Sequence, residues 1–81
     1  MFKTVLKDFT VRVGEGKSRN VYTFKAGDMV VMGDDTFYTP EHIPEGHTYL
    51  EGSVAFFDDS KNTMYPMYAF LTEDELAEYI S

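Results

Sequence analysis

The feature that most constrains this chain is a series of short β-type segments separated by glycine, proline and acidic residues. From Thr4 to Val13 apolar and polar residues alternate, which is the period of a strand with one buried face. Lys7 is the exception on the apolar side. Further runs rich in β-forming residues cover 21–26, 29–32, 48–57 and 64–71. The pattern predicts five or six short strands within a single domain that spans residues 1–81.

The segments between these runs have the composition of loops and turns. Residues 14–20 contain two glycines among polar residues, which predicts a loop too long for a two-residue hairpin turn. Pro40 and Pro44 exclude a helix interior and a central strand, so residues 37–47 are predicted to form a surface loop. Gly52 predicts a bend in the strand that follows this loop.

The C-terminal segment carries the sharpest local signal in the chain. Thr72 is followed three residues later by Glu75, the pattern of a capping box at a helix N-terminus. Leu71 and Leu76 occupy the two positions of a hydrophobic staple. Acidic residues fill the first turn, where the helix dipole favours negative charge. The sequence therefore predicts a short C-terminal helix that lies back on the barrel.

Three short motifs carry a resemblance to a known type of fold. Residues 24–31, Phe-Lys-Ala-Gly-Asp-Met-Val-Val, look like the x-x-G-D-x-V opening of SH3-like barrels. Residues 46–49, Gly-His-Thr-Tyr, are similar to the G-x-x-Y that starts a later strand there, and Phe70-Leu71 before an acidic helix resembles the end of many such domains. Over residues 24–80 the chain resembles SH3-like small β-barrel proteins, of the kind often encoded by bacteriophages. The resemblance implies a mainly β fold: a small SH3-like barrel with an added N-terminal hairpin and a short C-terminal helix.

Charge divides the chain into two unequal parts. Residues 1–26 carry six Lys or Arg and two Asp or Glu, which gives a net charge of +4. Residues 27–81 carry one Lys and twelve Asp or Glu, which gives a net charge of −11. The first part is therefore a basic N-terminal hairpin, and the second is an acidic barrel with its helix. The total of −7 opposes binding to duplex DNA and to an anionic membrane. The absence of cysteine excludes disulfides, zinc fingers, iron–sulfur clusters and thiol nucleophiles.

The acidic part predicts a protein partner with a basic surface. Carboxylates can take the place of nucleic-acid phosphates, so a set of them could occupy a nucleic-acid-binding groove. We expect a phage-type, non-enzymatic binding protein that inhibits a host enzyme or defence complex in this way, in the cytoplasm of the host cell. The alternative is an acidic surface that only keeps a small domain soluble. The candidate partner-binding residues are Asp34, Asp35, Asp58, Asp59, Glu73, Asp74, Glu75 and Glu78.

Two other functions stay open at this point. Lys17 and Arg19 in the glycine-rich loop could contact phosphate, as in a nucleic-acid or ribosome accessory domain. His42 and His47 lie beside two carboxylates and belong to the residue types that bind metals or act in catalysis. Pro44, however, excludes the helical spacing of the familiar zinc motifs. No motif specifies a cofactor, and we expect none.

The predicted strand 64–71 is apolar on both faces, although a small barrel has only one interior. Pro66 places this strand at an edge or a bulge, and residues 54–57 are equally apolar on both sides. The surplus apolar face needs a cover, either from the chain itself or from a partner. A closed two-fold homodimer is one hypothesis. The candidate residues for self-association or apolar contact are Phe56, Met64, Tyr65, Met67 and Tyr68.

Overall fold

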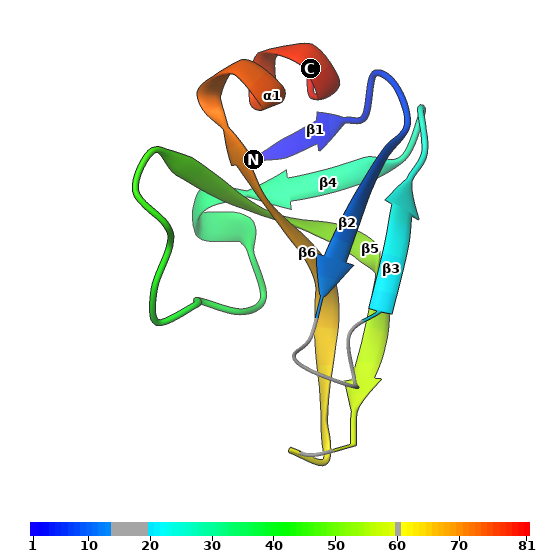
Figure 1. The fold of residues 1–81 in the computed structure, drawn as a ribbon, viewed down its shortest axis with the longest axis vertical. Helices are drawn as coiled ribbons and strands as arrows, with labels where there is room; N and C mark the ends of the chain where they lie inside the picture. Colours follow the sequence, from blue (N-terminus) through cyan, green and yellow to red (C-terminus); the bar gives the residue numbers. More distant parts are fainter. Residues whose placement is uncertain (14–19, 60) are drawn as a thin grey trace.

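A computed structural model describes residues 1–13, 20–59 and 61–81, and in it the chain is mainly β with two antiparallel sheets and one short α-helix (Figure 1). Strands β1, β4, β5 and β6 form one sheet in that order, and β2 and β3 form a separate hairpin. The two sheets do not close into a barrel. The elements are β1 (Phe2–Thr4), β2 (Phe9–Val13), β3 (Asn20–Phe24), β4 (Met29–Met32), the 3-10 helix η2 (Gly33–Asp35), β5 (His47–Asp58), β6 (Thr63–Thr72) and α1 (Glu73–Tyr79).

The predicted first strand, from Thr4 to Val13, is wrong as a single element. The structure divides it into β1, which pairs with β4, and β2, which pairs with β3. The division falls around Lys7, whose side chain lies in solvent and forms an ion pair with Glu78 at 2.6 Å. Because a charged side chain at this position cannot enter the core, the chain turns between two buried positions instead of continuing as a strand. The basic N-terminal segment therefore contributes to both sheets.

The core lies between the inner face of the four-stranded sheet and the β2–β3 hairpin. Phe9 and Phe24 of the hairpin stack on each other, with ring centroids 4.9 Å apart. Leu50 and Ala69 are among the buried residues that the sheet contributes. The complete buried cluster comprises Val5, Phe9, Phe24, Val30, Met32, Leu50, Met67, Ala69, Leu71 and Ile80.

The long β5–β6 hairpin bends where the sequence predicted it. The antiparallel register shifts between Glu51 and Ala55, around Gly52. A Cβ atom at Gly52 would lie 2.7 Å from Cε1 of the buried Phe24 ring on β3. Glycine at this position is therefore required for close packing of the β2–β3 hairpin on β5. Pro66 lies in β6, which is an edge strand of the four-stranded sheet, in agreement with its predicted position.

The predicted capping box at the start of α1 is confirmed. The Thr72 hydroxyl accepts a hydrogen bond from the Glu75 amide, and the Glu75 carboxylate accepts one from the Thr72 amide. These hydrogen bonds lower the pKa of Glu75 below its ordinary value, with the backbone amide of Thr72 as the largest cause.

After the helix, Ser81 exchanges two backbone hydrogen bonds with Thr4, which covers the outer edge of β1. No helix in the described part of the chain is long and apolar enough to cross a membrane.

Candidate functional site

Glu51 is the one charged residue that the structure buries among those it describes, with an exposed fraction of 0%. Its Oε1 atom accepts a hydrogen bond from the Phe37 amide at 2.7 Å, and its Oε2 atom accepts one from the Tyr38 amide at 2.9 Å. The Tyr49 hydroxyl also donates to Oε2, at 2.6 Å. Burial, and then this hydrogen bond to Glu51, raise the pKa of Tyr49 far above its ordinary value. A carboxylate with three donors is satisfied inside the fold.

These hydrogen bonds hold the start of the loop between η2 and β5. Gly33, with a φ of 67°, begins η2, and the Thr36 hydroxyl donates to its carbonyl at 3.0 Å. The next two residues then donate their amides to Glu51, so Phe37 and Tyr38 have fixed backbones. Phe37 is nevertheless 89% exposed and Tyr38 is 40% exposed. The fold thus uses a buried carboxylate to hold two aromatic residues at the surface.

Sequence reasoning counted Glu51 only as one of the acids and missed this role. Its neighbours in the strand alternate, so Leu50 faces the core while Tyr49 and Glu51 face the opposite side of the sheet. The available signal was an acid inside a strand whose other residues are mostly apolar or aromatic. That signal could not identify the donors, because two of them belong to a loop more than ten residues away.

A cluster of six aromatic rings, which we call the ring cluster, lies beside Glu51. Tyr38 stands edge-on to Tyr65, with centroids 5.4 Å apart and an interplanar angle of 89°. Phe56 bridges Tyr65 and Tyr68, at 5.8 and 6.3 Å. The cluster is thus continuous from the loop across β5 and β6. Its members are Tyr38, Tyr49, Phe56, Tyr65, Tyr68 and Phe70.

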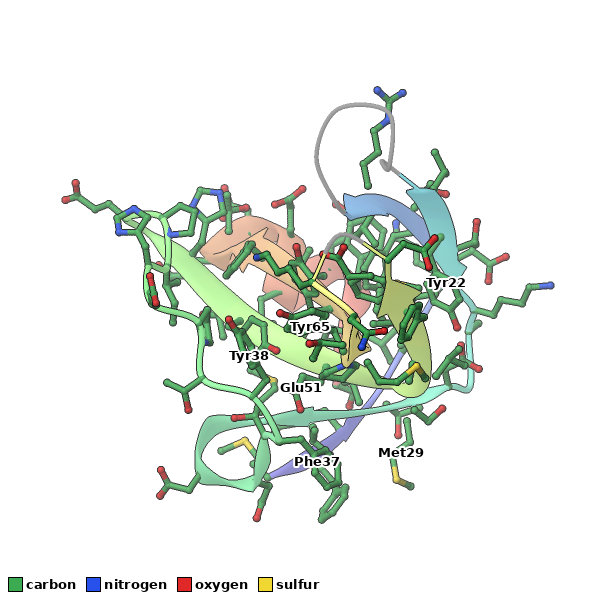
Figure 2. The ribbon with its side chains drawn as sticks, turned by 90° about the horizontal axis from the view of Figure 1, so that it is seen from below. Tyr22, Met29, Phe37, Tyr38, Glu51 and Tyr65 are labelled. Atoms are coloured by element: carbon green, nitrogen blue, oxygen red, sulfur yellow. The ribbon has the colours of Figure 1, made fainter. Side chains whose placement is uncertain are left out.

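The end of the ring cluster formed by Tyr38 and Tyr65 is accessible and already contacts a cation. Figure 2 shows Tyr38, Tyr65 and Glu51 grouped together, with Tyr22 apart from them on β3. The ammonium group of Lys61 lies over the Tyr65 ring, 5.9 Å from its centroid. The position is therefore one where a positive charge is attracted to an aromatic surface.

Further apolar residues are exposed next to this region. Phe2 and Met29 project from the outer side of β1 and β4, and both are exposed. Figure 2 shows Phe37 and Met29 pointing away from the body of the molecule on the same side. The register aligns Phe2 with Val31 and Val31 with Glu51, so the outer face of the sheet runs from β1 towards the ring cluster. Together they form an exposed apolar margin beside the ring cluster.

The predicted partner-binding acids do not gather on one surface. Asp34 and Asp35 lie in η2, whereas Asp58 and Asp59 lie at the β5–β6 turn, with Asp58 ending β5. Glu73, Asp74, Glu75 and Glu78 lie in α1. The helix and the β5–β6 turn are at opposite ends of the longest dimension of the chain, which is 34 Å (Figure 1). Within the chain, Asp35 pairs with the N-terminal amine, Glu78 pairs with Lys7, and Glu75 caps α1.

The predicted apolar contact residues divide between surface and core. Phe56, Tyr65 and Tyr68 belong to the half-buried ring cluster, and Met64 is exposed. Met67 is only 6% exposed and lies in the core, so it is removed from the set of contact residues. The reason is the alternation of β6, which points Met67 inward with Ala69 while Tyr68 faces outward.

Of the two remaining predicted sites, the structure describes only the histidine loop. A ring nitrogen of His47 lies 2.9 Å from the Glu45 carbonyl, and no group of three His, Cys, Asp or Glu able to hold a metal ion occurs in residues 1–13, 20–59 and 61–81. His42 is exposed in the same loop. Lys17 and Arg19 lie outside the described residues.

A groove of about 330 Å³ lies where β2 and β6 fail to close the barrel. Apolar side chains from Phe9, Leu71 and Tyr79 contribute to its walls, together with the charged side chains of Arg12 and Glu75. The groove is open and lies beside Tyr68, so it continues the ring cluster around the edge of β6.

Comparisons with protein-family models, with curated proteins and with solved structures find no match to this chain.

Proposed function

We propose that this chain is a non-enzymatic protein-binding module that docks on a basic surface of another protein. The observation that carries the proposal is Phe37, 89% exposed on a backbone that the buried Glu51 carboxylate holds in place. Large apolar side chains at the surface favour association when partners cover them, and a fixed backbone reduces the entropy lost on binding. Phe37 is therefore a preorganised anchor.

The charges around this anchor favour a cationic partner. Residues 27–60 contain eight Asp or Glu and no Lys or Arg, and this segment includes the whole loop that carries Phe37. A negative field of this kind speeds the association of a positively charged surface and suppresses other partners. The phage-type inhibitor of a host enzyme or defence complex is the specific form of this proposal, and the two open sheets would then be a variant of the SH3-like barrel.

The test compares the natural chain with two variants in capture experiments from bacterial lysate. Phe37→Ser removes the anchor, and Val21→Ser is the matched control, because Val21 is also an exposed apolar residue, 64% accessible, but lies on β3. We expect a partner that the natural chain and Val21→Ser retain and Phe37→Ser loses. The purified partner should bind more weakly as salt rises. A partner that binds both variants equally well contradicts a role for Phe37 as the anchor.

A further inference from the structure

We infer that the ring cluster is a receptor for an arginine side chain of the partner, with the guanidinium group on the Tyr65 ring beside Tyr38. The inference deepens the proposed function and rests on it, since it names the chemistry by which a basic surface is recognised. Three observations support it: the arrangement of the rings, the charge around them and the place of Lys61.

The rings form two adjoining surfaces of different orientation. Tyr65 presents a ring face, and Tyr38 stands perpendicular to it at 89° with centroids 5.4 Å apart. The Phe56 ring also contacts Tyr65, with centroids 5.8 Å apart and an interplanar angle of 30°. A planar cation can stack on one ring while its edge approaches the second, and it can do so without a large rearrangement of the site.

The charges around the rings are complementary to a cation. The Tyr38 amide donates a hydrogen bond to the buried Glu51 carboxylate at 2.9 Å, so a negative charge lies next to the residue that supplies one of the two rings. The loop that supplies Tyr38 also carries Glu41 and Glu45, and both residues are exposed to solvent. Because Glu51 is buried, its charge is screened less than a charge in water would be, which strengthens its attraction for a cation.

Lys61 marks the position at which the arginine would bind. Its ammonium group lies 5.9 Å from the centroid of Tyr65, so the ring already attracts a positive charge from the same chain. An ammonium is compact and strongly hydrated, whereas a guanidinium is planar and more weakly hydrated, so it stacks better on a tyrosine. An arginine from a partner should therefore displace Lys61. Removing the Lys61 charge should strengthen arginine binding.

The test uses two short acetylated peptides of equal charge, Gly-Arg-Gly-Arg-Gly and Gly-Lys-Gly-Lys-Gly, titrated into the full chain and followed by the NMR shifts of the tyrosine rings. We expect the arginine peptide to bind about threefold more tightly, to move the Tyr65 and Tyr38 signals most, and to gain about twofold in affinity with Lys61→Gln. Tyr65→Leu should abolish the preference for arginine. Tyr22→Leu, on the β2–β3 hairpin, is the matched control and should keep it.

Tyr38→Leu is a second variant in case Tyr65→Leu does not fold, because Tyr38 lies in a loop and is 40% exposed. Equal affinity for the two peptides, or an arginine preference that survives both Tyr65→Leu and Tyr38→Leu, overturns the inference. That failure is distinct from a failure of the proposed function, which depends on whether Phe37→Ser loses the partner from lysate. A chain that captures its partner through Phe37 but binds both peptides alike is a binding module without an arginine receptor.

Discussion

Replacing Glu51 by alanine should cost the protein a large part of its stability. The substitution leaves the buried Tyr49 hydroxyl without an acceptor, which costs about 1–3 kcal/mol. The Phe37 and Tyr38 amides are only partly buried and can reach water, so each loss costs about 1 kcal/mol. The total is about 3–5 kcal/mol, against a free energy of unfolding of about 4–12 kcal/mol for a domain of this size.

Urea denaturation measures this loss, with Glu41→Ala as the matched control from the exposed loop. Glu51→Gln keeps the volume and one acceptor oxygen, so we expect a smaller loss of about 1–2 kcal/mol. Hydrogen exchange should become faster at the Phe37 and Tyr38 amides in both Glu51 variants. If Glu51→Ala changes the unfolding free energy no more than Glu41→Ala does, the carboxylate does not hold the loop and the reasoning about Phe37 fails.

Four further substitutions test other parts of the fold. Gly52→Ala should lower the unfolding free energy by about 1–3 kcal/mol in urea denaturation, because its Cβ meets the buried Phe24 ring at 2.7 Å, and an unchanged stability would contradict this contact. Thr72→Ala should cost about 1 kcal/mol through loss of the helix cap. Because the pKa of Glu75 is lowered in the folded state, its contribution is complete above the ordinary value of 4.5 and is lost as pH falls through the lowered value. Glu75→Gln should therefore flatten the acid side of a stability–pH curve, and an unaltered curve would refute that role. The raised pKa of Tyr49 acts in the opposite direction: its contribution is complete below the ordinary value of 10.0 and is lost as pH rises above it, so Tyr49→Phe should reduce the alkaline decline in stability.

The sequence by itself determined the elements that are completed by near neighbours. The capping box of α1 needs only Thr72 and Glu75, three residues apart, so the residue types fix the start of the helix. The bend near Gly52 and the edge position of Pro66 follow from the backbone properties of glycine and proline. Most of the strands and turns were therefore predictable, because each depends on a few consecutive residues.

Tertiary structure decided what depends on distant residues. Alternation showed that β6 had two apolar faces, but only its packing against β5 and the core placed Met67 inside and Tyr68 outside. Tertiary structure also decided the division of the first predicted strand, because β1 pairs with β4 whereas β2 pairs with β3. Local sequence fixes the period of a strand, whereas its neighbours decide which face is buried.

Glu51 shows the same limit at the candidate site. The sequence shows an acid within a strand, but the role of this acid depends on the loop whose residues 37 and 38 donate their amides to the carboxylate. The sequence does not distinguish an acid exposed to water from a buried acid that accepts three hydrogen bonds, and only the second is costly to remove. The sequence determined the strands, the helix cap and the negative charge; the folded chain alone decided that one of those charges lies inside and holds an aromatic surface in place.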